Sequence, residues 1–250
     1  MNAPLPVLNG VKPSYLHLPH DKGRRGTLLL DYLCSRFPFV SREIWTARLE
    51  SGFIVAQDGR PLPPDAPFAA GATIYYYREA VAGNEPPIPF HERILYIGEH
   101  LIAVDKPHFL PVVPSGRYLR ETLLTRLRLH PALQHLNTAD FSPVHRLDKD
   151  TSGVMVAAKN DQAHRVLAQQ IGEKRAHREY RAIVHGNIKE HRGTIMGDIG
   201  RHPTDRKKMA IVHANGKPAT THFEVLERFG AYTLAVCKLE TGRTHQIRVH

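Results

Sequence analysis

A short, densely charged segment directly before an apolar strand is the feature that most restricts what this chain can fold into. Residues 143–159 read PVHRLDKDTSGVMVAAK, and five of the six residues from His145 to Asp150 carry ionisable side chains. Residues 151–153 predict a turn, and the apolar run after them predicts a strand that is buried on both faces. Such a loop holds a carboxylate among basic groups beside the protein core.

The first 80 residues predict a small α+β domain behind an irregular lead-in. Residues 1–25 are rich in Pro, Gly and His and show no period, so we expect no regular element there. In the domain itself, residues 26–80, apolar spacing, the N-cap Ser41 and the turn residues Asp58–Gly59 predict four elements. They are two helices, a hairpin and a closing strand, at residues 27–37, 41–52, 53–62 and 71–79.

A larger domain at residues 93–250 follows a Pro-rich linker at residues 81–92. Apolar periodicity predicts alternating strands and helices in this domain. The expected strands are residues 94–97, 100–106, 154–159, 179–186, 232–239 and 243–250, and the expected helices are residues 121–129 and 160–173. This pattern predicts an α/β or α+β fold with much antiparallel sheet. Of the two we expect α+β, with a mixed, largely antiparallel sheet.

The positive charge of the chain is concentrated in its second half. The net charge is +10, and residues 141–250 hold 19 of the 34 Lys and Arg but 11 of the 24 Asp and Glu, a net charge of +8. A basic half suits a polyanionic partner such as a nucleic acid. A solubilising surface has the same composition, so charge alone leaves both interpretations open.

Composition argues against several classes of protein. The two cysteines, Cys34 and Cys237, lie far apart, which disfavours a disulfide framework or zinc knuckle and indicates a reducing compartment. The N-terminus does not read as a signal peptide, and no apolar run is long enough to cross a bilayer. His245 and His250 lie five apart on a predicted strand and face opposite ways, so we expect no metal site. We therefore expect a cytoplasmic protein without a membrane or metal partner.

The basic neighbours of Asp148 predict an ionised carboxylate, because nearby positive charge favours the charged form. A fixed, ionised carboxylate can act as a general base or as a nucleophile, and it can equally cap a turn in a purely structural role. A glycosidase-like pair with Asp150 is disfavoured, because adjacent loop residues seldom keep the required gap and basic surroundings do not raise one pKa.

Three motifs together resemble the RluA-type pseudouridine synthases over residues 90–250. HRLDKDTSG matches the HRLD-x-x-TSG element of the family, and REYRAIVHG and LETGRTHQIRVH match later elements. VDKP, with Lys106, is similar to an earlier element. The N-terminal domain, with SREIWTARLESGFIVAQDGRPL, resembles the small RNA-binding domain named after ribosomal protein S-four. The resemblance implies a pseudouridine synthase catalytic domain preceded by a small α+β RNA-binding domain.

The resemblance also implies roles for individual residues. Asp148 falls on the catalytic aspartate, Tyr180 on the active-site tyrosine, and Arg243 on the arginine that pairs with the catalytic carboxylate. Arg146 falls on the arginine that takes the place of the extruded base. The other expected RNA contacts are Lys106, Lys174, Arg178, Arg42 and Arg48. We interpret the rest of the motif as scaffold, in which Gly153 supplies a special backbone geometry and hydroxyls bond the turn. These scaffold residues are His145, Leu147, Thr151, Ser152 and Gly153.

The function implied is an isomerase that converts specific uridines of RNA to pseudouridine, without a cofactor and as a monomer. Base flipping must precede the reaction. Large-subunit ribosomal RNA is the first expectation for the substrate, and transfer RNA is the alternative. A non-catalytic RNA-binding protein on the same fold and a hydrolase with a carboxylate nucleophile are the rival functions. Family members usually continue beyond the last motif, so we expect the catalytic domain to be incomplete at His250.

Overall fold

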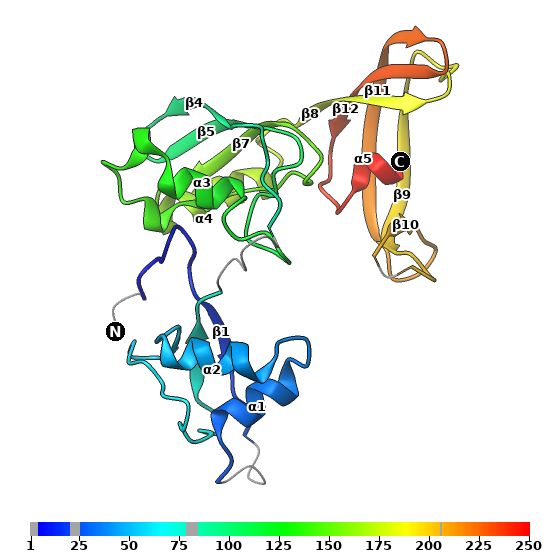
Figure 1. Cartoon of the computed structure of the whole chain (residues 1–250). Coiled ribbons are helices and arrows are strands. Elements are labelled where there is room, and N and C mark those ends of the chain that lie inside the picture. Colours follow the sequence, from blue (N-terminus) through cyan, green and yellow to red (C-terminus); the bar gives the residue numbers. More distant parts are fainter. Residues whose placement is uncertain (1–4, 21–25, 79–84, 206) are drawn as a thin grey trace. The chain divides into compact units, whose positions relative to one another are not determined.

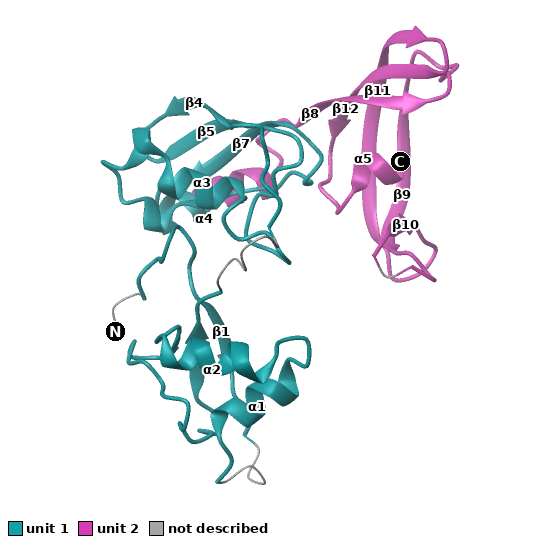
Figure 2. Ribbon diagram, viewed as in Figure 1, with its two compact units in different colours: residues 1–164 teal, residues 165–250 magenta. Residues whose placement is uncertain are grey.

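The computed structural model describes residues 5–20, 26–78, 85–205 and 207–250. These residues form two compact units, residues 1–164 and 165–250, shown in different colours in Figure 2. Every strand pairing among the described residues is antiparallel, which confirms the predicted α+β class with largely antiparallel sheet. Within the described ranges, we find no helix with the length and apolar character needed to cross a membrane.

The first part of unit 1 has a three-stranded sheet and two helices around their own core (Figure 1). The strands pair in the order β1-β3-β2. The elements are β1 (Ser14–His17), α1 (Leu29–Arg36), α2 (Arg42–Glu50), β2 (Ile54–Ala56) and β3 (Thr73–Tyr76). Ser41 caps α2 as predicted, because its hydroxyl accepts a hydrogen bond from the Ile44 N–H. Trp45 and Leu33 are among the side chains buried in this core.

Two details of this part differ from the prediction. Residues 14–17 form β1 within the predicted irregular lead-in, because pairing with β3 stabilises a segment too short to show a period. The predicted hairpin has only one regular strand, β2, and Pro61 meets Val55 in a single bridge, since Pro lacks the N–H of a ladder. Residues 1–4 and 21–25 of the lead-in and residues 79–84 of the closing strand and linker lie outside the described residues.

The second part of unit 1 is a four-stranded sheet with the order β4-β5-β7-β6. Its strands are β4 (Arg93–Ile97), β5 (Leu101–Lys106), β6 (Ser142–Pro143) and β7 (Gly153–Ala158). The accompanying helical elements are α3 (Leu123–Leu129), η2 (Pro131–Leu133), η3 (Thr138–Asp140) and the first residues of α4 (Asp161–Gly172). The β7 strand buries Met155, Ala157 and Ala158, but Val154 is 59% exposed. The prediction of burial on both faces therefore holds at the end of the strand and is wrong at its start. An apolar run without polar residues does not reveal which face the core covers.

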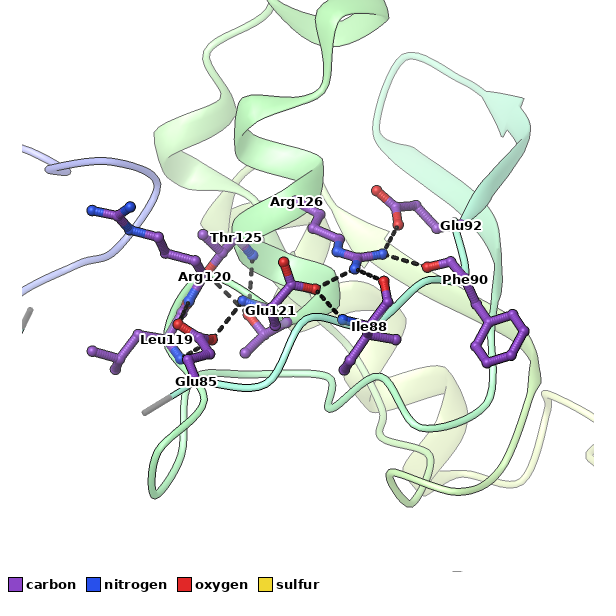
Figure 3. A network of polar contacts seen from close by, with 10 residues as sticks. Glu85, Ile88, Phe90, Glu92, Leu119, Arg120, Glu121, Thr125 and Arg126 are labelled. Carbon is purple, nitrogen blue, oxygen red and sulfur yellow. Dashed lines mark hydrogen bonds and ion pairs between the residues drawn. The ribbon is translucent and has the colours of Figure 1, made fainter. Parts of the chain in front are cut away.

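Residues 85–92 of the predicted linker are irregular but fixed to the α3 region (Figure 3). The Glu85 carboxylate accepts hydrogen bonds from three consecutive backbone N–H groups, residues 119–121, at 2.7, 3.2 and 2.7 Å. Arg126 of α3 donates to the carbonyl oxygens of Ile88 and Phe90 and also pairs with Glu121 and Glu92. This end of the linker is therefore part of the packed unit.

Unit 2 is built on a five-stranded sheet with the order β10-β9-β11-β12-β8. The strands are β8 (Glu179–His185), β9 (Arg192–Arg201), β10 (Met209–Ile211), β11 (Lys217–Phe229) and β12 (Tyr232–Leu239). The segment after β12 was predicted as a strand, but residues 246–249 form the helical turn α5 (Gln246–Val249). His245, with φ of 57°, turns the chain out of an extended path, and the Gln246 side chain bonds β11.

Candidate active site

Asp148 lies in the loop between β6 and β7 and is half-buried. Its carbonyl oxygen accepts a hydrogen bond from the Thr151 N–H at 3.1 Å, which closes a tight turn around Lys149 and Asp150. Lys149 and Asp150 form an exposed ion pair at 3.5 Å, which contributes little by itself. The backbone of Asp148 is therefore held in a tight turn.

The Lys106 side chain anchors this loop from the end of β5. Lys106 is fully buried, and its ammonium group donates hydrogen bonds to the carbonyl oxygens of Pro107 at 2.9 Å, Leu110 at 2.8 Å and Lys149 at 3.2 Å. All three N–H donors of the ammonium are thus used. The expectation that Lys106 contacts RNA is wrong for this structure, because a side chain without exposed surface cannot reach a phosphate.

Burial disfavours the charged form of Lys106, whereas the aspartates of the loop favour it. Burial lowers the pKa of Lys106 from 10.5 to about 8, while the charges of Asp150 and Asp148 act in the opposite direction. Lys106 thus brings positive charge near Asp148 from the protein interior. The two opposite charges attract each other across the loop.

The scaffold residues of the motif lie around this loop. His145 Nε2 accepts a hydrogen bond from the Val156 N–H at 3.1 Å, which ties the start of the loop to β7. Leu147 is buried at 8% exposure, and Gly153 has φ of 127°, a backbone conformation that residues with a side chain rarely adopt. Within the described part of unit 1, the Thr151 and Ser152 hydroxyls make none of the expected bonds to the turn. The Thr151 backbone N–H takes that role.

Arg146, which lies between His145 and Leu147, is exposed. The neighbouring side chains alternate between inward and outward positions, so the loop presents Arg146 to solvent while it buries Leu147. An exposed guanidinium can stack on a base and bind a phosphate at the same time. This exposure suits the role that the resemblance implies for Arg146.

Tyr180 and Arg243 belong to unit 2. Tyr180 lies in β8, is half-buried and pairs with Cys237 of β12 in the antiparallel register. Arg243 follows β12 in a turn, and its Nε donates to the Pro218 carbonyl oxygen at 2.9 Å. Asp148 belongs to unit 1, so the meeting of these three residues stays a prediction of the family resemblance.

Gln246 is a buried polar residue that the sequence analysis did not single out. It is 3% exposed and bonds to Thr220, Thr221, Thr241 and Arg243. Glutamine is mostly found on protein surfaces, so residue type gave no signal. Its position three residues after Arg243 could have drawn attention to it.

Two of the expected RNA contacts, Lys174 and Arg178, line a hollow of about 380 Å³ in unit 2. His177 and Lys238 add further nitrogen groups to its wall. Glu240 lies in the same wall and pairs with Lys174 at 3.7 Å, so the hollow is only partly basic. It is wide enough to admit a phosphate group, and whether RNA enters it stays a prediction.

The other expected RNA contacts, Arg42 and Arg48, lie on α2. Arg42 pairs with Asp31 of α1 at 2.7 Å, and both side chains remain about half exposed. The Arg48 guanidinium lies 5.0 Å from the centre of the Trp45 ring. Both arginines thus have local structural contacts, and their role in RNA binding stays a prediction.

No group of three or more metal-ligating side chains lies together in the described ranges. We expected His245 and His250 to face opposite ways on one strand. That expectation is wrong, because residues 246–249 form a helical turn. His250 Nδ1 bonds Thr221 Oγ1 at 2.9 Å, while His245 is the N-cap residue directly before α5.

Residues 100–250, which contain all the motifs except the S-four-like segment, match the family model described as RNA pseudouridylate synthase. The match contains Lys106, Asp148, Tyr180 and Arg243. It therefore includes the loop, its buried anchor and the two candidate residues of unit 2.

Several proteins named as pseudouridine synthases are similar to this chain in sequence over much of its length. The chain is 49% identical to ribosomal large subunit pseudouridine synthase D of Nitrosomonas europaea. This match covers 63% of the chain and 45% of the length of that relative. The chain is 42% identical to the protein of the same name from Pseudomonas aeruginosa, over 88% of its length and 68% of that relative. Among solved structures, human RNA pseudouridylate synthase domain containing 1 is 30% identical with a TM-score of 0.55, over 66% of each chain.

Proposed function

Because the chain belongs to the RNA pseudouridylate synthase family, we propose that it isomerises uridines of RNA to pseudouridine with Asp148 as the catalytic carboxylate. The observation that carries this proposal is the Asp148 loop within the matched residues, with the buried Lys106 ammonium bound to its backbone. A binding protein that only contacts RNA has no need for a carboxylate positioned in this way.

The reaction needs no net change in atoms or electrons. The bond from ribose C1′ to uracil N1 breaks, the base rotates, and a bond from C1′ to C5 forms. The proton on C5 leaves and N1 gains one. The Asp148 carboxylate either attacks the sugar as a nucleophile or moves a proton at the sugar, and both routes require the anion.

Three further residues complete the proposed site. Arg243 holds the Asp148 carboxylate in a charge-assisted pair, and Tyr180 stacks on the target base and presents its hydroxyl. Arg146 enters the RNA and fills the place of the extruded uridine, since base flipping leaves a gap in the stack. The exposure of Arg146 supports its part in this proposal.

The names of the relatives suggest the RNA. Both bacterial relatives described above are named as synthases of the large ribosomal subunit, and large-subunit ribosomal RNA is therefore the proposed substrate. The excess of positive charge in residues 141–250 supports a polyanionic substrate.

We assign residues 26–80 to an RNA-binding domain and residues 93–250 to the catalytic domain. The small sheet with its own core supports the first assignment, and the family match at 100–250 supports the second. Arg42 and Arg48 of α2 would then contact the RNA next to the target. We place the protein in the cytoplasm as a monomer that acts without a cofactor.

The proposal is tested in cells that lack the gene. Pseudouridines are mapped in total RNA before and after complementation with the wild-type gene and with Asp148→Ala. We expect one or more large-subunit sites to vanish and to return only with the wild type. An unchanged map, or restoration by Asp148→Ala, would overturn the catalytic proposal and favour a binding role.

A further inference from the structure

The Gln246 side chain closes a ring of hydrogen bonds between β11 and the turn that carries Arg243. Its Oε1 accepts from Thr241 Oγ1 at 2.8 Å and from the Arg243 N–H at 3.0 Å. Its Nε2 donates to the Thr220 carbonyl oxygen at 3.0 Å and to Thr221 Oγ1 at 2.9 Å. The Thr220 N–H in turn donates to Thr241 Oγ1 at 3.0 Å.

This network uses the full hydrogen-bonding capacity of the amide and fixes its orientation. A glutamine has two acceptor sites and two N–H donors, and all four are used here. The Arg243 N–H needs an acceptor, and the Thr220 carbonyl needs a donor. The glutamine amide offers both, whereas an ionised glutamate has no donor and methionine has no N–H, so neither can reproduce this link between the turn and the sheet.

The ring holds the backbone of Arg243 while a second contact holds its side chain. The Arg243 Nε donates to Pro218 of β11, the strand to which Gln246 is bound. Within the described part of unit 2, the two terminal nitrogens of Arg243 make no hydrogen bond or ion pair. The guanidinium is thus fixed at one nitrogen, and its fork remains available for an anionic partner.

Arg178 also packs against this turn. A methyl group added at Gly242 would overlap Arg178 Nη1, so the glycine allows this guanidinium to lie against the turn backbone. The turn 241–243 is therefore contacted by both Gln246 and Arg178. Substitutions at Gln246 alter one of these two supports and leave the other in place.

We propose that Gln246 is a positioning residue for Arg243, which aims the arginine at the catalytic carboxylate by fixing the turn 241–243 to β11. This inference rests on the proposed function, because the orientation of the Arg243 side chain affects the rate only if Arg243 takes part in the reaction. Gln246 itself touches no reacting atom. Small displacements of a positioned group lower the rate of the chemical step more than they weaken substrate binding.

A double-mutant cycle on the full-length protein tests this inference. Single-turnover pseudouridine formation and RNA affinity are measured for the wild type, Gln246→Met, Arg243→Ala and the double variant. We expect Gln246→Met to lower the rate by about ten- to a hundredfold at nearly unchanged affinity. The double variant should be no slower than Arg243→Ala, since Gln246 acts through Arg243. Losses that multiply would overturn the inference.

Thr233→Val is the matched control for lost stability. Thr233 is a fully buried hydroxyl of β12 that donates to the Gly186 carbonyl and accepts from the Ile188 N–H. It lies near the opposite end of β12 from the turn. The Thr233→Val substitution should lower the melting temperature about as much as Gln246→Met does. It should not lower the rate of pseudouridine formation.

Hydrogen exchange of the Arg243 backbone amide tests whether Gln246 holds the turn, and it needs no assay of enzyme activity. Exchange should be slow in the wild type and in Thr233→Val and faster in Gln246→Met, whereas equal exchange in all three would overturn the inference. A wild-type protein that forms no pseudouridine on any RNA would overturn the proposed function instead, and the exchange result would still decide the structural role of Gln246.

Discussion

The ammonium group of Lys106 donates a hydrogen bond to the backbone carbonyl of Lys149, which directly follows Asp148 in the chain. The two lysines are 43 residues apart in sequence, and the bond joins the end of β5 to the loop before β7. The proposed catalytic carboxylate is thus held by a charge inside the protein as well as by its own turn.

Lys106→Met should change the pH dependence of stability. The folded pKa of about 8 lies below the ordinary 10.5, so between these values the unfolded state binds more protons and stability rises with pH. The wild type should therefore gain about 2 kcal/mol of unfolding free energy relative to Lys106→Met between pH 7.5 and 10. Urea unfolding of both proteins at the two pH values measures this gain. A constant difference would mean that the pKa of Lys106 is not lowered in the folded protein, as expected for a solvated ammonium group.

Glu85→Ala should release the segment 85–92 from the α3 region. The substitution removes an acceptor shared by three backbone N–H groups, and we expect a loss of about 2 kcal/mol of unfolding free energy. Proteases should cleave this segment faster, as followed by mass spectrometry. Glu99→Ala is the control, because the Glu99 side chain is 87% exposed. Equal cleavage in both variants would show that the segment is not held by Glu85.

Arg146→Ala should impair turnover more than RNA binding. The role proposed for this exposed arginine is to fill the gap left by the target base, which matters when the base is flipped. We expect a loss of rate of about a hundredfold with an RNA affinity within about threefold of wild type. Arg93→Ala, another exposed arginine of unit 1, should change neither quantity greatly. Equal losses of rate and affinity in Arg146→Ala would make Arg146 one more phosphate contact.

Lys174→Gln should reduce the salt dependence of RNA binding. Each phosphate contact adds about 0.7 to the slope of log affinity against log salt for single-stranded RNA. If Lys174 contacts one phosphate, the slope should fall by about that amount, for RNAs of any sequence. Titrations at several salt concentrations measure the slope. An unchanged slope would show that Lys174 serves only its ion pair with Glu240.

The sequence predicted the helices α1 to α4, seven of the strands and the central loop, because these depend on local patterns. The strands β6, β9, β10 and β11 were not predicted, so three of the five strands of unit 2 were missed. Apolar spacing located α1, α3, β5 and β12, and Ser41 located the start of α2. The same reasoning missed β1, because four residues carry too little periodicity and the strand depends on pairing with β3. It also predicted a strand where α5 forms.

The side chains that were misinterpreted or missed are buried polar groups. Lys106 was expected at the RNA and Gln246 was not considered, although both bind backbone carbonyls in the interior. Lysine and glutamine are usually exposed, so residue type favours the wrong environment. Their burial follows from partners that are distant in sequence, such as Lys149 for Lys106 and Thr220 for Gln246, and only the fold brings these together.

The most direct test of the central claim follows the hydrogen on uracil C5. Pseudouridine formation replaces the C5–H bond by the bond to ribose, so RNA labelled with tritium at C5 of uridine must release tritium. With large-subunit ribosomal RNA, the full-length wild-type protein should release one tritium per target uridine. Asp148→Asn, which keeps the side chain's shape but removes its charge, should release none while it still binds the RNA. Tritium release by Asp148→Asn at the wild-type rate would contradict the account.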